Sequence, residues 1–143
     1  MAATTPRQAV LRLLHATGDL PTQLHRFVAS LLKLIALPDT VGIMRVAISV
    51  SGTTNVGRQL YEEGTREVWI EIGEVLRAEV AKGTLRSDAD PGVMAAHLRA
   101  LCEIDIIRNL LGAQKTYSDQ ETNSKAQCIV DVFMRAYGAA PRQ

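Results

Sequence analysis

The stretch from Asp90 to Gly112 limits most strongly how this chain can fold, because as a helix it is apolar on most of its circumference. Asp90-Pro91 is a favourable helix start, and Gly112 is a favourable end. Six residues at alternating spacings of four and three form one row, which is typical of a helix packed along another: Val93, His97, Ala100, Ile104, Ile107 and Leu111. Other apolar residues flank this Val93–Leu111 row. Such a helix is buried on more than one side, and we expect one side to face another subunit.

The other apolar segments also recur with a helical period, which predicts an all-α protein of about seven helices in one domain. Outside residues 90–112, the expected helices cover residues 6–16, 22–37, 40–50, 56–63, 65–82 and 118–138. Several ends carry stop or capping signals, such as Gly64, Gly83 and the capping-box sequence of residues 118–121. Arg45 is the single charge between residues 41 and 50, so we expect it to find a partner or a route to solvent.

The composition is that of a globular protein, with 47% hydrophobic and 22% charged residues. A formal net charge of +1 and scattered Lys and Arg give no basic footprint for nucleic acid. No apolar run reaches membrane-spanning length, and the first ten residues lack the apolar core of a signal peptide. We therefore expect a cytoplasmic protein that contacts no membrane. Cys102 and Cys128 lie within predicted helices, and we expect both to be buried, reduced thiols.

The chain lacks the common signatures of catalysis and metal binding. It has no glycine-rich phosphate loop, no His-Glu-x-x-His and no Cys-x-x-Cys. Its three histidines, His15, His25 and His97, are spread over three predicted helices. We therefore expect no enzyme activity, no metal site and no cofactor.

A set of short motifs occurs in a fixed order along most of the chain. They are Arg45 in an apolar helix, Tyr61-Glu62-x-Gly64, Gly83-x-Leu85-Arg86, Asp90-Pro91, Asp105 with Arg108 to Gly112, and Phe133-x-x-x-Tyr137-Gly138. In this order, from about residue 18 to residue 138, they resemble the C-terminal domain of TetR-family transcriptional regulators.

The resemblance implies a fold and a function. The last two long helices are expected to form a homodimeric four-helix bundle, and the interior is expected to hold a small, largely apolar effector molecule. Residues 1–17 then correspond to the end of a connecting helix, residues 18–138 to the ligand-binding and dimerisation domain, and residues 139–143 to a tail. A DNA-reading helix-turn-helix is not expected in this chain. Two readings stay open: the sensing domain of a repressor, or a headless dimer that binds no DNA.

The expected cavity is closed and lies between helices that carry eight residues: Phe27, Met44, Ile48, Tyr61, Trp69, Ile72, His97 and Leu101. His97 is either a polar ligand contact or a satisfied core or interface histidine, and Tyr61 and Trp69 either line the pocket or pack in the core. Arg99 and Glu103 form an i,i+4 ion pair, which we expect at the solvent or dimer rim, and Asp105 and Arg108 form a structural i,i+3 pair. The expected dimer-interface residues are Cys102, Ile106, Leu110, Cys128 and Val132.

Overall fold

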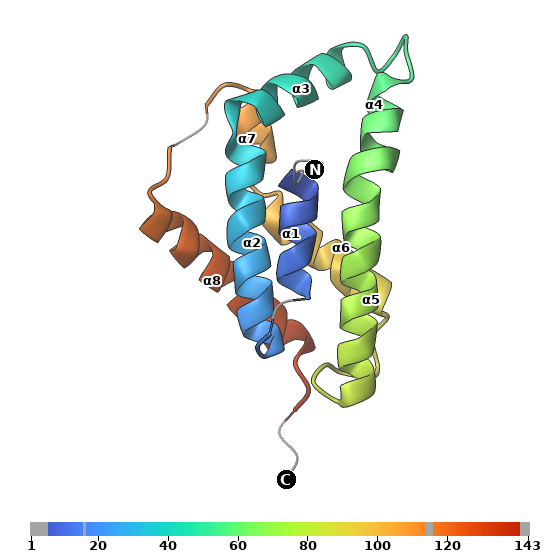
Figure 1. Cartoon of the computed structure of the whole chain (residues 1–143), viewed down its shortest axis with the longest axis vertical. Helices are drawn as coiled ribbons and strands as arrows, with labels where there is room; N and C mark the ends of the chain where they lie inside the picture. Colours follow the sequence, from blue (N-terminus) through green and yellow to red (C-terminus); the bar gives the residue numbers. More distant parts are fainter. Residues whose placement is uncertain (1–5, 16, 114–115, 141–143) are drawn as a thin grey trace, which may run out of the picture.

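The computed structural model describes residues 6–15, 17–113 and 116–140 of the chain, and within them the secondary structure is helical (Figure 1). The elements are α1 (Pro6–Leu14), α2 (Leu20–Ala36), α3 (Pro38–Ser49), α4 (Val56–Leu60), the π-helical turn η1 (Tyr61–Thr65), α5 (Arg66–Lys82), α6 (Pro91–Cys102), α7 (Ile106–Leu110) and α8 (Asp119–Tyr137). The run from residue 56 to residue 82 is uninterrupted. If it is taken as one helix, the described residues contain seven helices, as predicted.

Side chains that the sequence marks as caps begin three of the helices. Asp19 accepts a hydrogen bond from the backbone N–H of Thr22, and Asp90 accepts from those of Gly92 and Val93. Ser118 accepts from the N–H of Glu121, which confirms the predicted helix start there. These caps satisfy backbone donors that have no partner inside a helix. At the other end of α5, Gly83 adopts the left-handed conformation (φ 84°) that glycine tolerates best.

The predicted continuous helix of residues 90–112 is wrong in one respect, because it breaks after Cys102. Residues 103–105 form a turn, and the short helix α7 follows it. Asp105, in the turn, pairs with Lys125 of α8 and, at 3.5 Å, with Arg108 of α7. The predicted Asp105–Arg108 pair is thus confirmed, and the added bond to α8 ties the turn to another helix.

The helix end predicted at Gly64 is also wrong. Gly64 lies inside η1, where the N–H of Arg66 donates to the carbonyl of Tyr61, five residues earlier. The chain therefore passes from α4 into α5 through one wide turn without leaving the helical path. Such π-turns are rare and often lie at functional sites.

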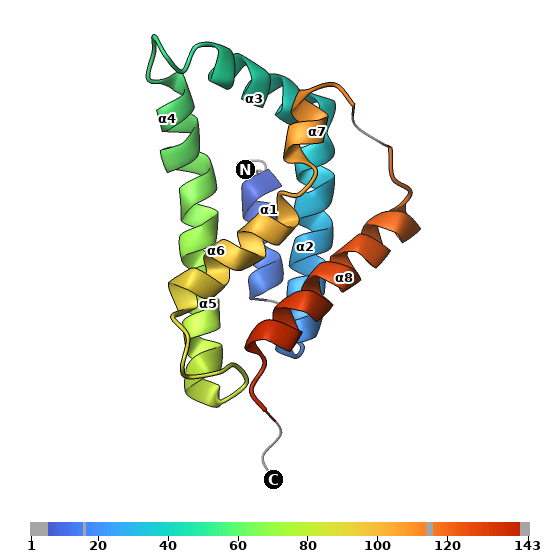
Figure 2. The same ribbon diagram turned by 180° about the vertical axis from the view of Figure 1, so that it is seen from behind.

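The core lies where two helix pairs meet, α2 with α8 and α5 with α6, with α1 packed against α2 and α5. Its largest fully buried side chains include Phe27, Phe133, Leu24, Ile72, Leu76, Met94 and Leu98. In Figure 1, α2 and the long α4–α5 run are separated from each other, and α3 crosses between their upper ends. Figure 2 shows α6 and α8 on the opposite face. α3 packs against α2, α4 and α7, and a cavity remains between α2 and the α4–α5 run.

Among the described residues, no single helix is long and apolar enough to cross a membrane. The pair α2 and α3 passes that test together by length and composition, but the two helices meet at a bend of 66°.

Candidate functional site: a cavity between α2 and the α4–α5 run

A cavity of about 680 Å³ lies between α2, α3, the α4–α5 run and the α6–α7 turn. This volume falls within the usual range for small-molecule sites. Most of its lining is aliphatic, from Leu31, Leu34 and Ile35 of α2 to Met44 and Ala47 of α3. Several lining side chains on the α3–α4 side are half exposed, for example Ile43 and Ile48 at 57% each. The cavity is therefore open to solvent on that side, which corrects the expectation of a closed one.

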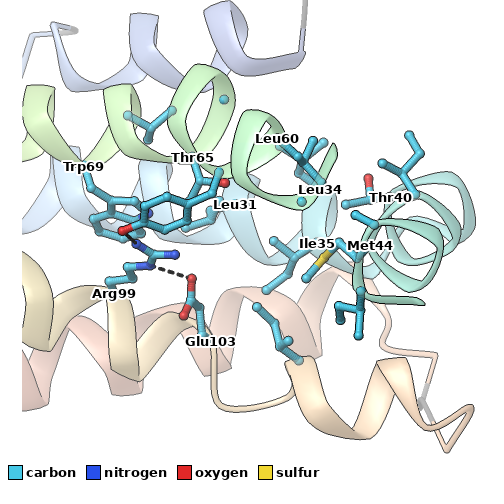
Figure 3. Close-up of a pocket in the computed structure, with 18 of the residues that line it drawn as sticks. Leu31, Leu34, Ile35, Thr40, Met44, Leu60, Thr65, Trp69, Arg99 and Glu103 are labelled. Atoms are coloured by element: carbon cyan, nitrogen blue, oxygen red, sulfur yellow. Dashed lines mark hydrogen bonds and ion pairs between the residues drawn. The ribbon is translucent and has the colours of Figure 1, made fainter. Parts of the chain in front are cut away.

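One end of the cavity is polar. Arg99, from the last turn of α6, donates from Nε to Glu103 Oε1 at 2.7 Å and from Nη1 to the Tyr61 hydroxyl at 3.3 Å. Its guanidinium also lies over the rings of Tyr61 (5.2 Å) and Trp69 (6.0 Å). Figure 3 shows Arg99, Glu103 and Trp69 at one end of the cavity, with Thr40 and Met44 at the other. Burial alone would lower the pKa of Arg99, but the hydrogen bonds that it donates to Glu103 and Tyr61 outweigh burial and raise that pKa.

The π-helical turn and the core together position the two aromatic rings of this end. Tyr61 is the first residue of η1, and Trp69 lies two turns later in α5. The Trp69 and Phe27 rings pack edge to face, with the ring centroids 5.8 Å apart and the planes at 89°. Such edge-to-face contacts add to the energy of burial. Phe27 is fully buried, so it fixes Trp69 from the core side.

A family model described as the C-terminal domain of AefR-like transcriptional repressors matches residues 22–139. The chain belongs to this family. The TetR resemblance seen in the sequence is thereby confirmed, together with the fold that it implied.

A solved structure agrees in fold. It is that of a protein from Mesorhizobium loti MAFF303099 assigned to the TetR family of transcriptional regulators, with a TM-score of 0.79 at 20% sequence identity. The match covers 92% of this chain and 65% of the other, so this AefR-like domain spans less than two-thirds of that protein's length. A comparison with curated protein sequences finds no match.

The structure divides the eight predicted ligand-binding residues of the AefR-like domain into two groups. Met44, Ile48, Tyr61 and Trp69 line the cavity. Phe27 and Ile72 do not, because both are fully buried in the core. Leu101 is half-buried against that core, and His97 lies on the outer side of α6, where its Nδ1 hydrogen-bonds the Tyr137 hydroxyl. These four residues therefore do not line the cavity, contrary to the prediction.

The sequence did not predict that a charged pair lines the cavity. The Arg99–Glu103 ion pair forms as predicted, but it faces the cavity and not a solvent or dimer rim. Ile106, predicted as an interface anchor, lines the cavity as well. The helical break after Cys102 explains the errors for Glu103 and Ile106, because residues beyond it no longer follow the face of a single continuous helix. The one signal in the sequence for a polar end of the cavity was this i,i+4 pair of opposite charges near a helix end.

The predicted dimer-interface residues are also divided. Cys102 is fully buried in its own subunit, and Ile106 and Leu110 are half-buried, so these three offer little surface to a partner. Cys128 is exposed, which corrects the expectation that both thiols are buried, and Val132 is 50% exposed. Four residues of the Val93–Leu111 row are more exposed than Cys102, Ile106 and Leu110. Val93 is 48%, Ile104 71%, Ile107 67% and Leu111 78% exposed.

Within the described residues, no group of three or more His, Cys, Asp and Glu side chains could hold a metal ion.

Proposed function

We propose that this AefR-like domain senses a largely apolar small molecule and joins a transcriptional repressor into a homodimer. One observation carries the sensing role: the cavity of about 680 Å³ has an aliphatic lining and a single cluster of charged and aromatic groups at one end. Small-molecule sites usually have this composition, mostly apolar with a few placed polar groups. Operator DNA would be contacted by a separate helix-turn-helix domain of such a repressor.

The exposed apolar surface supports the homodimer. The Val93–Leu111 row runs along α6 and α7, and Val132 and Cys128 lie on the exposed side of α8. Figure 2 shows α6 and α8 next to each other on one face, where His97 also stacks against Tyr137. Pairing this face with its symmetry mate would form a four-helix bundle with one self-complementary contact. A stable contact of this kind buries about 1,200 Å² or more in total.

Ligand binding can be tested by thermal shift. A ligand that binds only the folded state should raise the free energy of unfolding by about 2.7 kcal/mol at a hundredfold excess over its Kd. Met44→Trp should fill the aliphatic end of the cavity and remove the shift produced by apolar ligands such as n-octanol. Leu37→Trp is the matched control, because Leu37 is exposed and does not line the cavity. If both variants respond as the wild type does, the cavity is not the binding site.

A further inference from the structure

The polar end of the cavity contains one positive and one negative charge. Arg99 and Glu103 are the charged residues of the cavity lining, and they are bonded to each other at 2.7 Å. Their side chains are 24% and 34% exposed, so water screens them only in part. The cavity as a whole therefore presents no net charge to a ligand.

The pair still has capacity for further hydrogen bonds. An arginine carries five N–H donors, and two of those of Arg99 are bonded, one to Glu103 and one to Tyr61. The other three have no acceptor among residues 6–15, 17–113 and 116–140. Glu103 offers a second carboxylate oxygen, and the Tyr61 hydroxyl, which accepts from Arg99, keeps its own proton to donate. This end can thus donate to and accept from the same small polar group.

A charged ligand would meet opposition here. A carboxylate that bonds to Arg99 would lie close to Glu103, and an ammonium group that bonds to Glu103 would lie close to Arg99. In a partly dry site, either one would weaken the existing ion pair and leave one charge without full compensation. A neutral group that both donates and accepts, such as a hydroxyl or a primary amide, can join the cluster without breaking the pair.

We propose that the effector is an uncharged, elongated apolar molecule with one hydroxyl or amide group at its end, and that Arg99, Glu103 and Tyr61 select this group. The proposal rests on the sensing role proposed above and adds the class of ligand. The apolar part extends along the cavity toward Met44 and Thr40, at the opposite end from Arg99 in Figure 3.

Three probes of equal chain length separate the possible head groups: n-octanol, octanoate and n-octylammonium. Trp69 is the single tryptophan of the chain and lines the cavity, so its fluorescence reports binding directly. For the wild type at pH 7, n-octanol should bind at least about tenfold more tightly than either charged probe, because each charged probe leaves an uncompensated charge.

Charge-removing variants should reverse this order. Glu103→Gln leaves Arg99 without its carboxylate partner, so octanoate should gain about tenfold in affinity relative to n-octanol. Arg99→Gln should shift the preference toward n-octylammonium by a similar factor. Glu62→Gln is the control for Glu103→Gln: it makes the same change of charge in the neighbouring η1 turn, but Glu62 is exposed and does not line the cavity. The control should keep the wild-type order.

The outcomes distinguish this inference from the proposed function. If none of the three probes changes Trp69 fluorescence or the melting temperature, the sensing role itself fails. If the probes bind but octanoate or n-octylammonium is preferred by the wild type, or if the order does not change in the Glu103→Gln and Arg99→Gln variants, the cavity binds ligands but the head-group inference is wrong. Circular dichroism of each variant shows that it is folded, so loss of binding is not mistaken for a change of preference.

Discussion

Arg45 connects α3 to the end of α7 through backbone carbonyls. Its Nε donates to the carbonyl of Leu110 and its Nη2 to that of Asn109, each at 3.0 Å. The last carbonyls of a helix have no partner within it, and a cation there also interacts favourably with the helix dipole. The charge that the sequence left without a partner therefore caps another helix. Its partners could not be predicted, because a backbone carbonyl leaves no signal in the sequence.

Replacing Arg45 with methionine should lower the free energy of unfolding by about 1–2 kcal/mol, because two hydrogen bonds to a charged donor are lost from a largely exposed site. Urea denaturation followed by circular dichroism measures this. Arg58→Met in α4 is the control, since the Arg58 side chain is exposed and has no hydrogen bond or ion pair to the described residues. Equal losses in the two variants would show that the Arg45 bonds contribute nothing specific.

The Cys102 thiol should make the domain less stable in alkali. Burial, and then the nearby Glu103 carboxylate, raise the pKa of this thiol from 9.0 to about 12. Above pH 9 the unfolded chain loses the proton while the folded chain keeps it, so the free energy of unfolding should fall by up to about 1.4 kcal/mol per pH unit. Cys102→Ala should show a shallower decline between pH 9 and pH 10.5, whereas Cys128→Ala, at an exposed thiol, should decline as the wild type does. Equal slopes in all three proteins would contradict this.

At the scale of single elements, the break between α6 and α7 determines which residues face outward. The sequence predicts the start of the helix at Asp90, but Val93, Ile104, Ile107 and Leu111, predicted to pack along another helix, are exposed in the single subunit. It did not predict the turn at residues 103–105, because the bond that Lys125 donates to Asp105 joins residues twenty positions apart. As one continuous helix, residues 90–112 would place Ile106 and Leu110 toward a partner subunit and the Arg99–Glu103 pair at a rim.

Ile104→Asp should dissociate the proposed homodimer. Ile104 is 71% exposed in the single subunit, so in a monomer the new carboxylate would be solvated and nearly neutral in energy. In a dry subunit contact it would be a buried, unpaired charge, which costs several kcal/mol. Sedimentation velocity at micromolar concentration distinguishes the two cases.

Ile70→Asp is the matched control for this experiment, because Ile70 is 52% exposed on α5 and lies outside the Val93–Leu111 row. It should leave the dimer intact. A wild type that sediments as a monomer, or an Ile104→Asp variant that stays dimeric, would remove this face from the proposal.

At the scale of the whole molecule, one side has a well-packed core and the other side buries few large side chains. The core gathers where α2, α5, α6 and α8 meet, whereas α3 and α4 have no fully buried large side chain apart from Val41, near the start of α3. Helical period predicted all of these helices, since each has an apolar face. It could not predict that the faces of α3 and α4 surround a space, because an apolar face reads the same whether it meets a side chain or a cavity.

Hydrogen exchange should therefore be fastest, among the helical residues, in α3 and α4, because they bury little apolar surface. Saturating n-octanol should slow exchange there by at least about tenfold, since a ligand that packs against these helices stabilises their folded form. The first turn of α8 lies outside the cavity lining and should not change. Exchange in α3 as slow as in the buried part of α2, without ligand, would contradict this.

The π-helical turn at Tyr61–Thr65 makes the polar end of the cavity depend on the backbone bonding of five residues. A π-turn holds one residue more than an α-helical turn. If the turn took α-helical bonding without losing a residue, Tyr61 would rotate by about 100° relative to Trp69. Tyr61 would then leave Arg99, while α5 and the core stayed in place. A single codon deletion among residues 62–64, by contrast, would restore α-helical bonding and leave Tyr61 on the side of the helix that faces Arg99.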